Sequence, residues 1–333
     1  MRAITQSRYG GFDVLKLQDL PTPNPGPTEV RVRIHAAAIN DWELGLLYGK
    51  PLFMRIFLGL FRPRKMRIPG CDMSGTVEKV GKEVTRFKPG DKVYCDLSSS
   101  GFGAFADYVC VEEQVLAFKP SNLSFEQAAA IPHAGMLALQ GLRDLGGLQE
   151  GMSILINGAG GGVGMLALQY AKLSRCLVAG VDSGRKQAYL HLLGFDDCID
   201  FEQEDFTQRG KQYDLILDVK TTRRPSAYLR ALKPGGTYVT VGGHTGLIFL
   251  IALLGRWIKW RHGKTLKVLP LKPNKGLDEL TGLIESGKLL PAIDKRFALK
   301  EVPQALERFA QARHEGKIII RVLGEELLTD GGG

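Results

Sequence analysis

The sequence lacks the cysteine pattern of a disulfide-stabilised secreted protein. Its five cysteines are odd in number, and no two of them form a Cys-x-x-Cys pair. A disulfide framework is therefore not expected. This cysteine usage predicts a protein of a reducing compartment, and we expect that compartment to be the cytoplasm.

The sequence also lacks a segment suited to cross a membrane. Residues 1–5 do not lead from a charged stretch into an apolar run, so no secretory signal is expected. The apolar stretch from Leu247 to Leu254 is far shorter than the ~20 residues that a spanning helix needs, and Arg256 follows it. We interpret this stretch as a buried helix or as a wall of a substrate pocket.

Long runs of like charge are absent too, although the formal net charge is +9. Lysine and arginine are spread through the chain, without the block of five or six that marks a nucleic-acid-binding arm. The sequence therefore predicts no nucleic-acid partner.

The chain of 333 residues is long enough for two globular domains, and its two parts differ in pattern. Residues 29–36 alternate apolar and polar side chains, as in a half-buried strand. Further short strands between Gly and Pro turns are predicted at 75–81, 91–94 and 105–111. This part of the chain predicts a small barrel-like sheet.

An alternation of strands and helices begins near Ser124, which stands three residues before Gln127 as in a helix capping box. Such alternation predicts a parallel, doubly wound sheet. Residues 317–322 form a final strand-like segment that could rejoin the first domain. The predicted strands of the sheet are 153–157, 177–181, 214–218 and 237–241, and the predicted helices are 164–173, 185–193, 225–232 and 276–287.

A glycine-rich segment stands between the first of these strands and its helix. It reads Asn-Gly-Ala-Gly-Gly-Gly-Val-Gly over residues 157–164. A dinucleotide pyrophosphate binds backbone N–H groups at a helix N-terminus, where side chains would block its approach. We therefore predict a dinucleotide site that includes Ala159, Gly160, Gly161, Gly162, Val163 and Gly164.

The residues after the next strand bear on which dinucleotide is bound. Asp182 closes that strand where a carboxylate would accept hydrogen bonds from a ribose, which favours NADH. Arg185 and Lys186 follow it and could pair with a 2′-phosphate, which favours NADPH. Both cofactors stay open, NADPH being the first expectation, and Ser183 is included in the predicted site.

Five motifs occur in order along the chain. They are Gly-Cys-Asp-Met-Ser-Gly at 70–75, Phe-Lys-Pro-Gly-Asp-Lys-Val at 87–93, Gly-Phe-Gly-Ala-Phe-Ala-Asp-Tyr at 101–108, the glycine-rich segment 159–164 and Val-Gly-Gly at 241–243. Together they resemble the medium-chain dehydrogenase/reductase superfamily, and within it the zinc-independent quinone oxidoreductases related to zeta-crystallin. The resemblance extends from about residue 1 to residue 322.

The resemblance implies an α/β fold of two domains. A GroES-like, β-rich catalytic domain is expected from residues 1–123 and 288–333, and a Rossmann domain with a doubly wound parallel sheet from residues 124–287, with the active-site cleft where they meet. A homodimer formed by continuing the Rossmann sheets is also expected. By the same resemblance, Phe201 lies beside the adenine, and Gly242 and Gly243 belong to the cofactor site.

Zinc-dependent members of the superfamily use a cysteine, a His-Glu pair and a later cysteine. At these places this chain has Asn40, Cys71-Asp72 and Ala134. A catalytic zinc normally takes three protein ligands, so one thiolate does not suffice and no metal is expected. His133 stays a minor candidate for a proton donor.

Without a metal, the carbonyl must be polarised by hydrogen bonds while the acceptor is held against the nicotinamide. The resemblance places Asn40 in the cleft, where its amide could orient the substrate oxygen or the nicotinamide. Tyr48 follows in the same loop region and could donate a proton. The apolar segments 51–61 and 246–260 could line the pocket, or be core or dimer contacts.

These features predict an NAD(P)H-dependent oxidoreductase that passes a hydride to a small hydrophobic carbonyl, enone or quinone. Two alternatives stay open. One is an NAD(P)-dependent alcohol dehydrogenase, and the other is a non-catalytic dinucleotide-binding sensor or structural protein.

Overall fold

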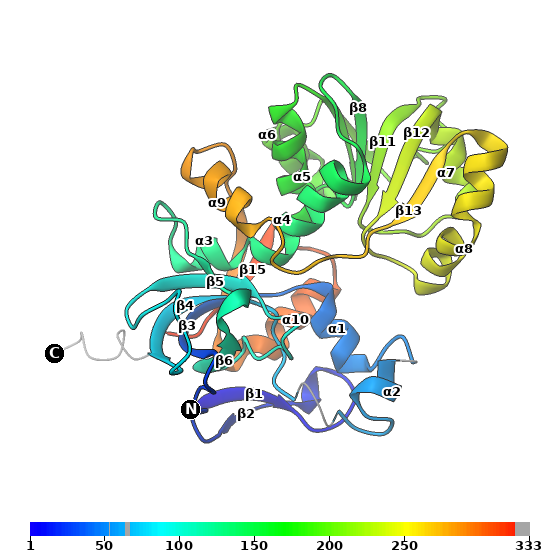
Figure 1. Cartoon of the computed structure of the whole chain (residues 1–333). Coiled ribbons are helices and arrows are strands. Elements are labelled where there is room, and N and C mark those ends of the chain that lie inside the picture. The colour runs from blue at the N-terminus through cyan, green and yellow to red at the C-terminus, as the bar shows by residue number, and fades with distance from the viewer. Residues whose placement is uncertain (53, 64–66, 324–333) are drawn as a thin grey trace. The chain divides into compact units, whose positions relative to one another are not determined.

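The computed structural model describes residues 1–52, 54–63 and 67–323, which form two compact units (Figure 1). Unit 1 comprises residues 1–133, 273–285 and the chain from 291 onward, and unit 2 comprises residues 134–272 and 286–290. The first division therefore falls after residue 133 rather than after residue 123, and residues 273–285 belong to the first unit rather than to the second.

Packing explains both differences from the expected domain limits. The short helix α3 (Phe125–Ala129) lies on unit 1, where Phe125 stacks on His35 with 3.9 Å between the ring centroids. The helix α9 (Leu277–Glu285) is bonded to the same unit, because the Tyr94 hydroxyl hydrogen bonds to it at 2.7 Å. The segment forms a helix, as predicted, but the residues that this helix contacts lie in unit 1.

Unit 1 is built on a seven-stranded sheet of order β14-β15-β3-β4-β5-β7, with β6 paired to β3, and on a two-stranded sheet, β1-β2. Every pairing except β14-β15 is antiparallel. This confirms the predicted β-rich first domain. Its strands are β1 (Arg2–Gln6), β2 (Leu15–Asp19), β3 (Glu29–Ala38), β4 (Asp72–Val80), β5 (Lys92–Asp96), β6 (Tyr108–Glu112), β7 (Ala117–Phe118), β14 (Ile293–Ala298) and β15 (Lys317–Arg321), and its other helices are α1 (Asp41–Tyr48), α2 (Met54–Leu58) and α10 (Val302–Ala310).

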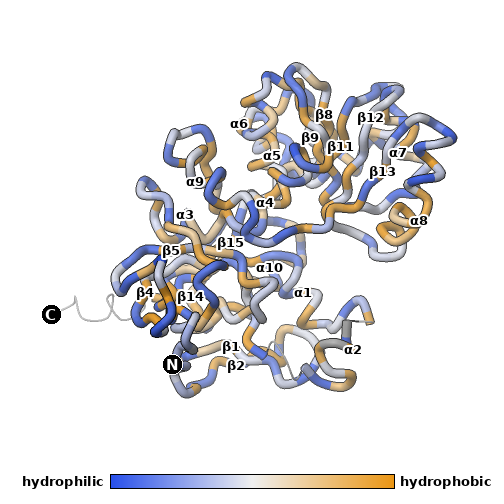
Figure 2. Tube along the Cα trace, viewed as in Figure 1, coloured by the Kyte–Doolittle hydropathy of each residue, from blue (hydrophilic) through white to orange (hydrophobic). Residues whose placement is uncertain are grey.

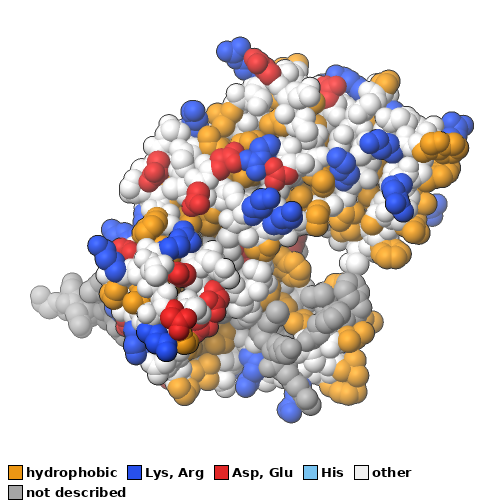
Figure 3. All heavy atoms as spheres, in the orientation of Figure 1, with side chains coloured by type: hydrophobic (Ala, Val, Ile, Leu, Met, Phe, Trp, Pro, Cys, Tyr) orange, Lys and Arg blue, Asp and Glu red, His pale blue; other side chains and the backbone are white. Residues whose placement is uncertain are grey.

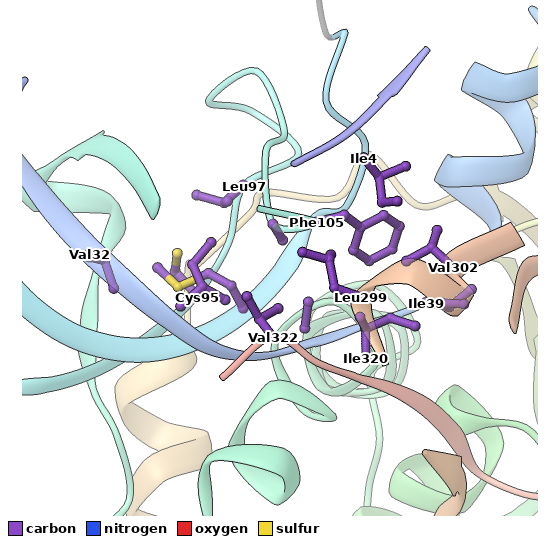
Figure 4. Packing of buried hydrophobic residues seen from close by; sticks show 14 of the residues in the cluster. Ile4, Val32, Ile39, Cys95, Leu97, Phe105, Leu299, Val302, Ile320 and Val322 are labelled. Carbon is purple, nitrogen blue, oxygen red and sulfur yellow. The ribbon is translucent and has the colours of Figure 1, made fainter. Parts of the chain in front are cut away.

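The two ends of the chain meet in the core of unit 1 (Figure 4). Ile4 and Val32 from the beginning, Phe105 from the middle, and Val302 and Ile320 from the end are each at most 1% exposed. Burial of a side chain of this size contributes about 1.5–3 kcal/mol. The strand predicted at 317–322 therefore rejoins the first domain as part of its core, since β15 pairs with β3.

Unit 2 contains a six-stranded sheet of order β10-β9-β8-β11-β12-β13 in which every pairing is parallel. In chain order this is 3-2-1-4-5-6, the arrangement of a doubly wound dinucleotide-binding fold, as predicted. The sequence did not predict the two edge strands, β10 and β13. The elements are β8 (Ser153–Asn157), α5 (Gly162–Leu173), β9 (Leu177–Asp182), α6 (Gln187–Leu193), β10 (Asp197–Asp200), β11 (Tyr213–Asp218), α7 (Pro225–Ala231), β12 (Leu232–Thr240), α8 (Thr245–His262) and β13 (Thr265–Val268), and α4 (Pro132–Leu139) begins at the division between the units.

The apolar stretch in α8 is a helix, but only one of its faces is buried. Ile251 and Ile258 pack into the core of unit 2, whereas Phe249 is 70% and Trp260 is 80% exposed. Figure 2 shows the apolar character of this helix. The prediction of a buried helix is thus wrong for its outer side. No helix among the described residues is long and apolar enough to span a membrane.

The apolar segment 51–61 is exposed as well. Leu52, Ile56, Leu60 and Phe61 are all exposed, and Phe53 lies outside the described residues. This segment contributes little to the core of unit 1, apart from the buried Leu58.

Candidate functional site

The glycine-rich turn of unit 2 lies between β8 and α5, at the carboxyl end of the sheet. In the strand order, the chain crosses from β8 to β9 on one side and to β11 on the other, so β8 marks the topological switch point where such folds bind ligands. α5 begins at Gly162 with no side chain capping it. The first N–H groups of a helix concentrate positive potential, so this turn suits a pyrophosphate.

Close packing explains why the turn needs glycine. A Cβ on Gly164 would lie 2.3 Å from the carbonyl oxygen of Ala159, and a Cβ on Gly160 would lie 2.8 Å from Lys186 Cδ. Ala159 itself is fully buried, so its methyl group packs inside the protein. The alanine at the first position of the motif therefore leaves the turn open to a ligand.

Asp182 at the end of β9 is bonded directly to the turn. Its two carboxylate oxygens accept 2.9 Å hydrogen bonds from the backbone N–H groups of Gly160 and Ser183. Lys186 Nζ lies 3.5 Å from Asp182 Oδ1, and both side chains are largely buried. Beside them, the Ser183 hydroxyl is buried without a hydrogen-bond partner among the described residues. An orphaned hydroxyl next to an open helix N-terminus fits a bound dinucleotide.

The other predicted cofactor residues gather at the same strand ends. Phe201 donates its N–H to the Asp182 carbonyl at 3.2 Å, and its ring is half exposed. Arg185 is exposed, and no acidic side chain in the described part of the chain pairs with it. Gly243 has a φ of +121°, and a Cβ there would lie 2.2 Å from the backbone nitrogen of Thr221, so only glycine fits. Gly242 accepts the Thr221 N–H at 3.1 Å.

Sequence reasoning missed a buried polar group at the ends of β8 and β11. Asp218 accepts hydrogen bonds of 2.7 Å from Asn157 Nδ2 and from the Tyr238 hydroxyl. Burial raises the pKa of Asp218 above its ordinary range. Both Asn157 and Asp218 come directly after apolar strand residues. That position in the sequence could have indicated a polar group at the ends of these strands. These bonds hold the carboxyl ends of β8, β11 and β12 together beneath the turn.

Unit 1 contains a second cluster, in which buried polar side chains surround the Lys317 ammonium. This group donates to Asn40 Oδ1 at 2.6 Å, to Asp72 Oδ2 at 3.1 Å and to the Ile39 carbonyl at 3.1 Å. Lys317 is 4% exposed and Asp72 is fully buried. We define the buried polar cluster as Asn40, Glu43, Cys71, Asp72, Asp96, His133 and Lys317, all of which belong to unit 1.

Asn40, a predicted catalytic residue, is fully engaged within this cluster. Its amide nitrogen donates to Asp72 Oδ2 at 3.0 Å and to Cys71 Sγ at 3.1 Å, and its oxygen accepts from Lys317. The side chain is only 6% exposed. Tyr48, the other predicted catalytic residue, lies outside the cluster at the end of α1, where its half-buried ring packs edge-on against Phe12.

His133 reaches the cluster, whereas Ala134 contributes no polar atom to it. The His133 Nδ1 lies 2.8 Å from Asp96 Oδ2. Burial alone would lower the pKa of His133, but the bond to Asp96 raises it above the ordinary value. The Cys71, Asp96 and His133 ligand atoms lie within 4.8 Å of one another, which makes them a candidate metal group that the sequence did not predict.

These three residues do not fit a catalytic zinc. Ligand atoms held tetrahedrally about 2.1 Å from zinc are about 3.4 Å apart, whereas His133 and Asp96 are joined directly at 2.8 Å. Burial and the neighbouring carboxylates raise the pKa of Cys71 well above its usual range.

Both parts of the chain match known families. Residues 26–121 match the alcohol dehydrogenase GroES-like domain, and residues 193–320 match the zinc-binding dehydrogenase family. The chain is 33% identical to 2-methylene-furan-3-one reductase of Solanum lycopersicum and 32% identical to the chloroplastic NADPH-dependent alkenal/one oxidoreductase of Arabidopsis thaliana, covering 96% of this chain and 79% of each relative. The quinone oxidoreductase structure from Coxiella burnetii aligns with a TM-score of 0.85 at 30% identity, over 97% of this chain and 99% of that one.

The buried carboxyl group of Glu43 predicts a pH-dependent stability. It accepts N–H groups from Asn40 at 2.8 Å and Cys71 at 2.9 Å, yet burial raises its pKa to about 7 from 4.5. Between these values the folded protein binds more protons at Glu43 than the unfolded chain does. The free energy of unfolding should therefore fall as the pH rises across this window, by about 3 kcal/mol from this group.

Denaturant unfolding of wild type and Glu43→Gln at both ends of the window tests this expectation. The variant should be less stable at either pH, because one N–H loses its acceptor, but its stability should fall less as the pH rises. Part of the decrease in stability with rising pH should remain in the variant, because the pKa values of Asp72 and His133 are raised too. Glu301→Gln, which removes a similar carboxylate bonded to the Ala298 N–H, should retain the wild-type fall. An undiminished fall in Glu43→Gln would contradict the assignment.

Proposed function

The chain belongs to the quinone oxidoreductase branch of the medium-chain dehydrogenase/reductase superfamily, and on that premise we propose that it is an NADPH-preferring, zinc-independent reductase of small hydrophobic enones or quinones. The observation that carries the proposal is the open turn between β8 and α5, with the orphaned Ser183 hydroxyl beside it. Two relatives, a furanone reductase and an alkenal/one oxidoreductase, support an enone as acceptor. The Coxiella burnetii neighbour supports a quinone.

The cofactor is held by this chain's own backbone at the start of α5. The N–H groups of Gly162, Val163 and Gly164 would hold the pyrophosphate, and Phe201 would offer its ring to the adenine. When bound, the reduced nicotinamide supplies a hydride. The protein's part is to orient the acceptor and to exclude water, which accounts for a large share of such rate enhancements.

The preference for NADPH rests on how Asp182 is neutralised. Its two oxygens already accept backbone N–H groups, and the Lys186 ammonium lies 3.5 Å away. A carboxylate whose charge is offset by these N–H groups and by the ammonium repels a 2′-phosphate less than a carboxylate without such neighbours does. Arg185, exposed and without an acidic partner among the described residues, then supplies a charged donor to that phosphate.

Independence from zinc rests on the chemistry of the buried polar cluster. The bond between His133 and Asp96, the bond from Asn40 to the Cys71 sulfur and the ammonium of Lys317 satisfy this region without an ion. The match to a zinc-binding dehydrogenase family covers residues 193–320, which include none of the three candidate ligands.

For the chemical step we propose unequal roles for the two predicted catalytic residues. Asn40 is a positioning residue, because its amide joins Lys317 to Asp72 and Cys71. Tyr48 is the proposed proton donor, since the part of the chain that is described offers its hydroxyl no hydrogen-bond partner. A homodimer joined at the outer edge of β13 and a reducing, cytoplasmic setting for the five free cysteines complete the proposal.

Steady-state oxidation of NADPH and of NADH tests the function, with a naphthoquinone, an α,β-unsaturated ketone and a simple aldehyde as acceptors. We expect turnover with the quinone or the enone, a higher kcat/KM with NADPH, and unchanged rates after chelation of a preparation assayed for metal. Activity only with an alcohol and an oxidised cofactor would favour the alcohol dehydrogenase. Cofactor binding without any turnover would favour a sensor.

The substitution Arg185→Ala should change the KM for NADPH and the KM for NADH to different extents. Loss of a charged hydrogen bond to the 2′-phosphate should raise KM for NADPH by roughly tenfold to a hundredfold and leave KM for NADH unchanged. The matched control is Arg175→Ala, because Arg175 is exposed and precedes β9 at the opposite edge of the sheet. Equal changes with both cofactors would remove Arg185 from phosphate recognition.

The substitution Tyr48→Phe tests the proton donor. Without the hydroxyl, kcat should fall by about a hundredfold with little change in KM, because general acid catalysis of this kind contributes at least that much. If kcat stays as in wild type, solvent supplies the proton.

A further inference from the structure

The outer face of α8 presents large apolar side chains to solvent. Phe249, Leu253, Trp257 and Trp260 are 70%, 69%, 55% and 80% exposed. Their spacing of four, four and three residues places them on one side of the helix. We call this set the α8 apolar face.

Folding of unit 2 does not account for this face. The opposite side of α8, with Ile251 and Ile258, already fills the core against Leu266 of β13. A helix on the surface of a globular protein normally places polar residues outward. α8 is apolar on both sides, and unit 2 leaves its outer side uncovered.

The charges around this face all have one sign. Arg256, Lys259 and Arg261 are exposed on α8, and no ion pair joins them to an acidic residue within the described ranges. The chain has no aspartate or glutamate between Asp218 and Asp278. In Figure 3, the region of α7, α8 and β13 accordingly shows hydrophobic and basic side chains without acidic ones.

We propose that α8 binds the surface of an anionic lipid bilayer, lying in the plane of the interface with its apolar face in the headgroup region. Exposed Trp, Phe and Leu flanked by Lys and Arg are the composition of interfacial helices, and Trp favours that depth. Each cation near an anionic surface strengthens binding by about fivefold. The helix lies on the membrane and does not cross it, consistent with the absence of a spanning helix among the described residues.

Two other occupants fit this face less well. A second copy of the chain, docked through the same face, would bring two sets of Arg256, Lys259 and Arg261 together with no acidic residue to pair with them. A nucleic acid would use the cations but would leave the apolar side chains in water. A lipid surface satisfies both kinds of side chain at once.

Flotation of the full-length protein with vesicles tests the proposal, using phosphatidylcholine alone and an equal mixture with phosphatidylglycerol. We expect binding only to the anionic vesicles. The charge-reversed variant Arg256→Glu, Lys259→Glu, Arg261→Glu should bind at least about a hundredfold more weakly. The control Lys16→Glu, Lys82→Glu, Lys88→Glu makes the same change in net charge on exposed strands and turns of unit 1, and it should bind as wild type does.

A second measurement reports on the apolar face itself. The chain has three tryptophans, so Trp42→Phe leaves only those of α8. Their fluorescence should shift to the blue on anionic vesicles and be quenched by lipids brominated on the acyl chain. Trp257→Ser, Trp260→Ser should abolish vesicle binding, whereas Leu192→Ser, at a leucine of α6 that is 84% exposed, should not.

The opposite results would overturn the proposal. These are absence of binding to anionic vesicles, equal loss in the two charge-reversed variants, or unshifted tryptophan emission. Conversion of a dimer to a monomer by Trp257→Ser, Trp260→Ser, with vesicle binding intact, would assign the face to a second copy. Tighter binding to an oligonucleotide than to the vesicles, insensitive to these tryptophan changes, would assign the cations to a nucleic acid.

Discussion

A single buried cation organises the β-rich unit. The Lys317 ammonium, on the last strand, joins Asp72 on β4 to Asn40 at the start of α1, segments that are far apart in the sequence. Removal of one partner from a buried ion pair costs about 3–5 kcal/mol, because the other charge is left uncompensated. β15 is therefore held by its charge as well as by its apolar side chains, and the chain ends cannot separate without exposing Asp72.

The buried polar cluster of unit 1 and the turn of unit 2 differ in how far hydrogen bonds within the protein satisfy their polar groups. In the buried polar cluster, Asn40, Asp96 and His133 have their bonds satisfied within the protein. At the turn of unit 2, the Ser183 hydroxyl has no partner among the described residues, and no side chain caps α5. A buried polar group without a partner destabilises a fold unless a ligand satisfies it. This contrast fits the proposal that the turn binds a ligand.

Local signals in the sequence were sufficient to predict the sheet of unit 2, one helix start and the position of the glycine-rich turn. The alternation of strands and helices predicted the parallel sheet, and the capping box at Ser124 is present, with its hydroxyl accepting the Gln127 N–H at 3.2 Å. The turn residues and Asp182 could be placed together because each directly follows a strand of the same parallel sheet, whose carboxyl ends share one edge.

Features that depend on distant contacts could not be predicted in this way. Nothing near Lys317 in the sequence shows that Asp72 will neutralise it, and His133 reaches Asp96 only through tertiary packing. The apolar stretch of α8 was predicted to be a buried helix or a wall of a substrate pocket, and composition alone does not tell which side of a helix the core will cover. The edge strands β10 and β13 are four residues each, too short for a periodic pattern.

The open edge of β13 has a geometric consequence. β13 pairs with β12 on one side and with no described strand on the other, and α8 packs beside it. Antiparallel pairing of two copies along this edge has its two-fold axis perpendicular to the sheet, and such an axis keeps equivalent helices on the same side. The two α8 helices of a dimer would then face one surface together. Bivalent attachment multiplies modest affinities by about 10²–10⁴ through effective concentration, so a weak contact by each helix would retain the pair.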